Sequence, residues 1–207
     1  MSALLFIPAG TFHYWQGWIY ILTFTLSSVA YVVYLVKHDP ALLKRRTEAG
    51  ISYEKETTQK IVISFIYITF FTLFIFAPLD FRFGWSNVPW YNSIFGDVLV
   101  AISFYIFYLV SKVNTYAAAN VRVEKEQKVI STGLYGIVRH PMYLGALILV
   151  LGTPLALGSW WGLVSVLVFI VLLAIRTFIE EKTLRTGLRG YNDYATRVRY
   201  RLIPMVW

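Results

Sequence analysis

Two segments of the chain combine residue types and spacings that could support chemistry. Residues 133–145 read GLYGIVRHPMYLG and place an arginine, a histidine and two tyrosines before a long apolar run. Where that run ends, Arg176 and Glu180 stand four residues apart, on one face of a helix. Ionisable groups at membrane depth are costly, which makes them candidates for function. A guanidinium can hold a carboxylate, and a carboxylate can accept hydrogen bonds from a cofactor. These segments predict a polar site at one end of two antiparallel helices.

The same residues also have an ordinary structural interpretation. An arginine that snorkels at a helix end and pairs with a glutamate four residues on is common. His140 could cap a helix at the interface, and Pro141 suits a first helical turn. The tyrosines could form an aromatic belt at the membrane boundary: Tyr135, Tyr143, Tyr191 and Tyr194. The adjacent Glu181 and the number of ionisable groups at one helical mouth favour a functional site.

Composition identifies the elements that must position these residues. The 207 residues are 57% hydrophobic and 14% charged, with a mean hydropathy of +0.59, which is typical of a membrane protein. The uncharged runs 14–36 and 61–79 are long enough to cross a core of about 30 Å as helices. The shorter run 98–110 needs interfacial residues on both sides to complete a span. Residues 142–175 carry no charge but are interrupted by Pro154 and 158–162, which predicts a helical hairpin near the short limit for crossing.

The predicted fold class is all-α: an integral membrane protein of about five transmembrane helices with a C-terminal helical hairpin, a cytoplasmic cap and no Rossmann domain. Six of the 19 lysines and arginines fall in residues 37–60, five in 112–141 and seven in 176–207, whereas the opposite loop holds only Arg82. Because cytoplasmic loops carry the excess of positive charge, we expect the N-terminus outside and the C-terminus and site in the cytoplasm. Without a basic region or cleavage pattern before it, the first span is expected to be a retained anchor.

Several classes of function are disfavoured. The net charge of +8 follows the topology rule and suits anionic lipid headgroups, so nucleic acid is not an expected partner. Without cysteine, disulfides, thiolate chemistry and prenylation of the chain itself are excluded. The three histidines are far apart and form no zinc-binding motif, so no metal is expected. No nucleophile elbow, P-loop or GxGxxG motif is present.

The polar segments suggest how the chain is organised. We expect a single membrane domain over 1–207, with residues 1–113 as a three-helix scaffold and 114–207 as the catalytic, cofactor-binding half. Residues 41–46 could form an amphipathic surface helix, but a solvated basic loop is the preferred interpretation. Residues 114–130 are expected at the interface, and the last thirty residues are expected to fold back over the hairpin as a cap.

Four motifs in order carry a family resemblance: RHPMYLG at 139–145, RxxxEExxL at 176–184, YxxY at 191–194 and RLIP at 201–204. Together they resemble the isoprenylcysteine carboxyl methyltransferase family and the related phospholipid methyltransferases of membranes. The resemblance covers roughly residues 114–207. The first three spans carry no comparable signature.

The resemblance implies S-adenosylmethionine as methyl donor, with S-adenosylhomocysteine as product, bound at the cytoplasmic mouth. Carried over by position, the cofactor-binding residues would be Gln127, Lys128, Val129, Ile130, Tyr135, His140, Pro141, Met142, Tyr143 and Glu180. Asn120 would contribute by its place along the chain. Arg176 would bind the methyl-accepting substrate, so Arg176 and Glu180 are the expected catalytic pair.

The expected function is an S-adenosylmethionine-dependent methyltransferase that methylates the carboxylate of a prenylcysteine or another lipid-like acceptor entering laterally from the bilayer. An in-line displacement requires alignment and water exclusion more than a covalent nucleophile. A carboxylate is already ionised at neutral pH and needs no base. An amine acceptor must first lose a proton, for which Glu181 or His140 would be the base.

Three alternatives remain. A phospholipid N-methyltransferase would use the amine chemistry. An NADPH-dependent membrane sterol-type reductase shares similar Arg-His-Pro-x-Tyr and Tyr-Arg-x-x-Pro patterns, although Ala146 stands where that family typically shows an acidic residue. A non-catalytic scaffold would keep the polar cluster for stability alone.

Overall fold

The computed structural model describes residues 1–54, 56–117 and 127–207, and no strand occurs in these ranges. The eight α-helices described are α1 Ser2–Ala9, α2 Trp15–His38, α3 Pro40–Thr47, α4 Thr57–Phe83, α5 Trp90–Val113, α6 Pro141–Ala156, α7 Leu163–Gly187 and α8 Tyr191–Arg197. Two short 3-10 turns, η1 Ile51–Tyr53 and η2 Gly133–Gly136, complete the elements. The predicted all-helical fold without a Rossmann domain is confirmed.

Four helices are long and apolar enough to span a membrane: α2, α4, α5 and α7. Helix α6 is apolar but has only 16 residues, so the prediction of about five spans holds as four long helices and one shorter one. Helix α5 starts at Trp90 and so includes Asp97. The interfacial residues expected on both sides of 98–110 therefore complete that span. The chain is a multi-pass membrane protein, and the orientation of its termini stays a prediction.

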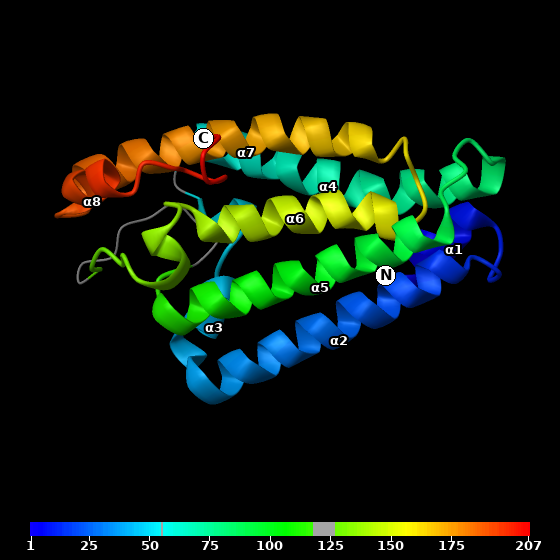
Figure 1. Ribbon diagram of the computed structural model, residues 1–207, viewed down its shortest axis with the longest axis horizontal. Helices are drawn as coiled ribbons and strands as arrows, with labels where there is room; N and C mark the ends of the chain where they lie inside the picture. Colours follow the sequence, from blue (N-terminus) through cyan, green and yellow to red (C-terminus); the bar gives the residue numbers. More distant parts are fainter. Residues whose placement is uncertain (55, 118–126) are drawn as a thin grey trace.

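The long helices are packed side by side along one direction (Figure 1). Helix α5 lies between α2 and α6, and α4 packs against both α7 and α1. Helices α6 and α7 run antiparallel and are joined by a turn in which Ser159 donates to the Asp80 carboxylate of α4. The predicted helical hairpin is confirmed, and its turn is fixed to the scaffold helices.

Two glycines bring α5 and α6 unusually close. A Cβ atom on Gly96 would lie 2.2 Å from the backbone nitrogen of Ala156, and one on Gly152 would lie 2.8 Å from the carbonyl oxygen of Gly96. Small residues at helix crossings let backbones approach, as is usual inside membranes. This crossing fixes the position of α6, whose first turn follows Arg139 and His140.

The segment after α2 differs from the preferred expectation. A solvated basic loop over residues 41–46 was wrong, because Pro40–Thr47 forms helix α3. The Asp39 carboxylate accepts from the backbone N–H of Leu42 at 2.9 Å, and Pro40 occupies the first turn, so the helix is well started. Leu42 is fully buried against Tyr31 and Leu35 of α2. Helix α1, which precedes the first span, was not predicted.

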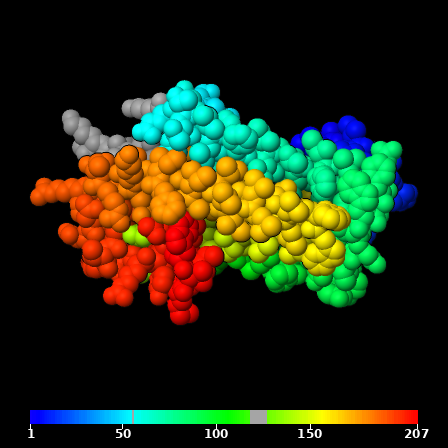
Figure 2. Space-filling model, turned by 90° about the horizontal axis from the view of Figure 1, so that it is seen from above, coloured from blue at the N-terminus to red at the C-terminus, as the bar shows by residue number. Residues whose placement is uncertain are grey.

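The C-terminal residues fold back toward the start of α6. Helix α7 continues past Arg176 to Gly187, so Arg176 lies within the helix rather than at its end. Tyr200 and Arg201 follow α8. Their carbonyls accept from the backbone N–H groups of Arg139 and His140, both at 2.9 Å. The surface view shows these last residues lying against α7 (Figure 2). The predicted fold-back over the hairpin is confirmed.

Candidate active site

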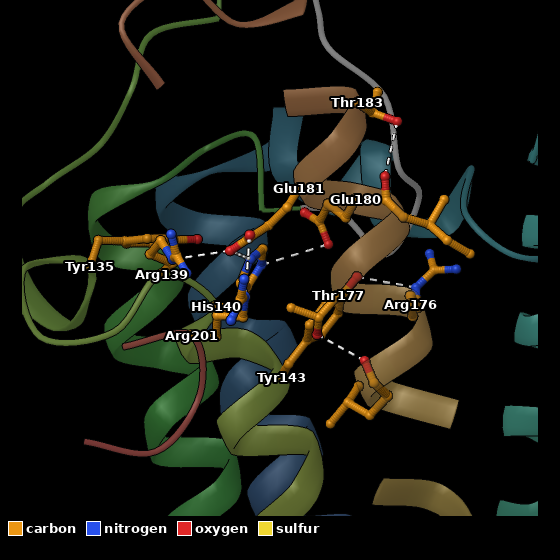
Figure 3. A network of polar contacts seen from close by, with 12 residues as sticks. Tyr135, Arg139, His140, Tyr143, Arg176, Thr177, Glu180, Glu181, Thr183 and Arg201 are labelled. Atoms are coloured by element: carbon orange, nitrogen blue, oxygen red, sulfur yellow. Dashed lines mark hydrogen bonds and ion pairs between the residues drawn. The ribbon is translucent and has the colours of Figure 1, made fainter. Parts of the chain in front are cut away.

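Glu181 is the centre of a buried ionic cluster at the mouth of the hairpin. Its carboxylate lies 3.0 Å from Nε of Arg139, 3.3 Å from Nε of Arg201 and 3.4 Å from Nε2 of His140. Arg185 lies at 3.9 Å, one helical turn on. The side chains of Glu181 and Arg139 are each only 5% exposed. These pairs tie α7 to the start of α6 and to the C-terminal segment, so Glu181 has a structural role (Figure 3).

Glu180 points to the other side of His140. Its Oε2 lies 3.8 Å from Nδ1 of His140, and this buried oxygen accepts no hydrogen bond in the described structure. Its side chain is 24% exposed, in contrast to the enclosed Glu181. His140 stacks on the Tyr143 ring with 5.5 Å between centroids. The Tyr143 hydroxyl accepts from Nε of Arg176 at 3.1 Å. The two adjacent glutamates therefore have different surroundings, and Glu180 retains an unused acceptor.

A cavity opens beside Glu180. It lies between the segment before η2, the first turn of α6, the end of α7 and α8. Its described lining is Asn114, Tyr116, Ala117, Lys128, Val129, Ile130, Tyr135, Arg139, His140, Met142, Tyr143, Glu180, Leu184, Leu188, Tyr191 and Tyr194. Binding sites for small molecules typically combine apolar walls with a few polar groups.

The tyrosines of the cavity are held in place and remain neutral. The Tyr194 hydroxyl donates to the carbonyl of Tyr135 at 2.8 Å, and Asn114 Nδ2 donates to the Tyr135 hydroxyl at 2.8 Å. Tyr191 keeps a buried hydroxyl without a partner in the described structure. Burial raises the pKa of Tyr135, Tyr191 and Tyr194 above the usual value for a phenol. The cavity is thus lined by uncharged aromatic rings around one carboxylate.

Arg176 lies next to this cavity without lining it. Its Nε donates to the Tyr143 hydroxyl at 3.1 Å, its Nη1 to Oε1 of Gln59 at 3.1 Å, and its Nη2 to Oε1 of Glu54 at 2.8 Å. The arginine is 3% exposed and Glu54 is 4% exposed. Figure 3 shows Tyr143 between His140 and Arg176. Arg176 lies on the side of Tyr143 that is away from Glu181. Tyr143 therefore joins the cavity to the Arg176 site.

The structure brings most of the predicted site residues together. Eight of the ten expected cofactor residues line the cavity, and the exceptions are Gln127 and Pro141. Pro141 is buried in the first turn of α6, where it starts the helix. Asn120 lies outside the described residues. Among the described residues, no group of three or more His, Cys, Asp and Glu side chains is arranged to hold a metal.

Sequence reasoning missed two partners of Arg176. Glu54 follows η1 and Gln59 lies in the first turn of α4, both in the half expected to be scaffold. No motif marks them, because they meet Arg176 only through folding. Their position within a basic stretch, close to the start of a span, was the one available signal.

Part of the chain matches a known protein family. Residues 91–189, a little under half of the chain, match the model of the phospholipid methyltransferase family. The matched region includes α5, the hairpin and both glutamates. The resemblance to the group of isoprenylcysteine and phospholipid methyltransferases is confirmed over these residues.

A shorter part of the chain is similar to a sterol reductase. The Delta(14)-sterol reductase TM7SF2 of Mus musculus is 37% identical over 84 residues, which cover 39% of this chain and 20% of the relative. The chain thus spans about a fifth of the length of this relative, and the likeness is confined to that part.

Proposed function

We propose that the chain is an S-adenosylmethionine-dependent methyltransferase that acts on the carboxylate of a prenylcysteine or another lipid-like acceptor. The observation that carries the proposal is the cavity around Glu180, which is lined by aromatic side chains, two of them from α8. S-adenosylmethionine, when bound, supplies a methyl group activated on a sulfonium. A carboxylate and neutral aromatic faces are the groups that attract such a cation.

Different side chains of the site would bind the cofactor and the acceptor. The unused Oε2 of Glu180 accepts from the amino or ribose groups of the cofactor. Tyr191 offers its unpaired hydroxyl, and Tyr135 and Tyr194 present rings fixed by their hydrogen bonds. The adjacent Arg176 holds the acceptor, and Tyr143 sets the distance between the two. Alignment of this kind is the main requirement of a displacement between two bound reactants.

Arg176 favours a carboxylate acceptor over an amine. A guanidinium binds a carboxylate by charge-assisted hydrogen bonds and repels an ammonium group. Glu181, a base candidate for amine chemistry, is engaged by Arg139, Arg201 and His140. This arrangement disfavours the phospholipid N-methyltransferase alternative. Because the acceptor is lipid-like, we propose that it enters from the bilayer, while the cofactor enters from the cytoplasmic side.

The sterol-type reductase remains the second candidate because of the 37% identity to the mouse reductase. It requires NADPH, whose phosphates need cationic partners. Among the described lining residues the cations are Lys128 and Arg139, and Arg139 is already paired with Glu181. Ala146, where an acidic residue is expected in reductases, packs against the apolar cluster of Val150, Val166 and Leu173. Both features favour the methyltransferase.

Calorimetric titration of the detergent-purified protein with S-adenosylhomocysteine and with NADPH tests the proposal. We expect S-adenosylhomocysteine to bind with micromolar affinity and Glu180→Gln to abolish this binding. Glu48→Gln, a change of the same kind at an exposed surface glutamate of the ion pair with Lys44, is the matched control. Binding of NADPH alone would establish the reductase, and binding of neither by folded protein would support a scaffold.

A further inference from the structure

Arg176 already binds a carboxylate from its own chain. Glu54 Oε1 lies 2.8 Å from Nη2 of Arg176, and both side chains are almost completely buried. A buried guanidinium without a counter-charge is strongly unfavourable, so some carboxylate must occupy this position. In the described structure Glu54 occupies the position that the proposed function assigns to the acceptor.

The segment that carries Glu54 includes a short turn, η1, whose side chains are exposed. Within η1, Ile51 and Tyr53 are 40% and 52% exposed. The backbone bonds of this turn are local, from Tyr53 N–H to the Gly50 carbonyl and from Glu54 N–H to that of Ile51. Gly50 has φ +125°, which is strained for any other residue. Glu54 itself has extended backbone geometry. Its carboxylate can therefore leave Arg176 without unpacking a long helix.

The site also contains a hydrogen-bond donor that Glu54 does not use. Gln59, in the first turn of α4, is 2% exposed and accepts from Arg176 through Oε1. Its Nε2 is buried and has no acceptor in the described structure. The opposite amide orientation would place two donors together, so contact with Arg176 fixes this assignment. A buried amide donor is costly when unpaired, and an additional ligand oxygen would satisfy it.

We propose that Glu54 is an internal carboxylate that holds the acceptor position on Arg176, and that the acceptor carboxylate exchanges with it and also accepts from Gln59. This inference rests on the proposed function, since it concerns the acceptor side of the same site. One carboxylate replaces another, so the buried guanidinium is paired throughout. Glu54 moves toward water from a surface turn.

The exchange also provides a direction for product release. In the methyl transfer, the carbon–sulfur bond breaks with its electrons left on sulfur, and a bond forms between the methyl carbon and a carboxylate oxygen. No proton moves, and the acceptor becomes a neutral ester. A neutral ester binds a guanidinium less strongly than a carboxylate does. Glu54 therefore displaces the ester more readily than it displaces the unmethylated acceptor.

Acceptor binding in Glu54→Gln tests the exchange. Calorimetry in the presence of S-adenosylhomocysteine uses two carboxylate probes, N-acetyl-S-farnesyl-L-cysteine and oleate, and the methyl ester of the first as the uncharged control. We expect Glu54→Gln to tighten binding of at least one carboxylate about tenfold, as expected when a neutral amide replaces a charged competitor. Binding of the ester should change little. Glu56→Gln, at an exposed glutamate two residues on, should match the wild type, and Gln59→Leu should weaken carboxylate binding.

The outcomes separate this inference from the proposed function. If the wild type does not bind S-adenosylhomocysteine, the proposed function fails. If it does bind, but Glu54→Gln binds both carboxylates no more tightly than the wild type, the exchange is refuted. Should Glu54→Gln fail to fold, hydrogen exchange in the wild type gives the answer. Amide exchange of residues 50–54 should rise when the carboxylate probe is added but not when the ester is added, and equal exchange with both would overturn the proposal.

Discussion

Glu180 and Glu181 are adjacent glutamates for which the structure predicts opposite consequences of the same substitution. Glu181→Gln removes the charge that Arg139, Arg201 and His140 share, whereas Glu180→Gln alters an oxygen without a hydrogen-bond donor. The two changes are chemically identical and one residue apart on α7. Any difference between them therefore comes from their surroundings.

The size of the Glu181 effect follows from burial. Arg139 is 6% exposed and Glu181 is 4% exposed. Breaking a buried pair by neutralising one partner typically costs about 3–5 kcal/mol, because the remaining charge is left without compensation. Some of that cost is relieved here, because Arg201 is 27% exposed at its side chain and can turn toward water. For a chain of this size, about 3 kcal/mol corresponds to a fall in melting temperature of roughly 6–12 °C.

The assay is thermal unfolding in detergent, followed by calorimetric titration with S-adenosylhomocysteine. We expect Glu181→Gln to lower the melting temperature by at least ~6 °C and to keep measurable binding at low temperature. Glu180→Gln should melt within about 2 °C of the wild type, as surface or cavity changes of under 1 kcal/mol do, and should not bind. The reasoning is refuted if both variants lose stability equally, or if Glu181→Gln loses binding without any loss of stability.

Three further predictions follow from the packing and the cap. Gly96→Ala should greatly reduce the yield of folded protein in detergent size-exclusion chromatography, because its Cβ would lie 2.2 Å from the α6 backbone, whereas Ala101→Val on the exposed face of α5 should have a normal yield. Tyr194→Phe should cost about 1 kcal/mol of unfolding free energy through its lost bond to Tyr135, while Tyr191→Phe, which removes an unpaired hydroxyl, should cost nothing measurable in the same denaturant titration. The pKa values of Tyr135, Tyr191 and Tyr194 are raised in the folded state, so the unfolded chain releases these protons at lower pH than the folded chain does. The free energy of unfolding should therefore be constant below about pH 10 and fall above it. A melting temperature that rises above pH 10 would contradict this.

Much of the fold was predictable from charge and hydropathy. Long uncharged runs must be spanning helices in a bilayer, because only internal hydrogen bonds satisfy the backbone there. The 158–162 segment marked the hairpin turn, whereas Pro154 lies within α6, two residues before its end. The prediction of a solvated loop over 41–46 was wrong. It rested on the three basic residues, whereas the cap at Asp39 and the burial of Leu42 stabilise a helix there. Whether a short polar helix forms depends on what it packs against, and a sequence pattern does not report that.

Eight of the ten cofactor residues implied by the resemblance line the cavity, and the differences in their surroundings appear only in three dimensions. The spacing of Arg176 and Glu180 correctly placed both at the hairpin mouth. It did not show that Glu181 would be enclosed by three basic side chains and Glu180 left with a free oxygen. Adjacent helical residues differ in direction by about 100°, so one faces the C-terminal segment and the other the cavity.

The contacts of Arg176 change how the two expected halves of the chain are related. Residues 114–207 were expected to hold the catalytic site and residues 1–113 to serve as scaffold, yet Glu54 and Gln59 of the first half are both hydrogen-bonded to Arg176. A family comparison that starts at residue 91 contains neither of them. If the acceptor binds at Arg176, the residues that select it therefore lie partly outside the region that defines the family. Relatives that share the cavity beside Glu180 would then differ in acceptor through the residues from η1 to the first turn of α4, while the hairpin stays the same.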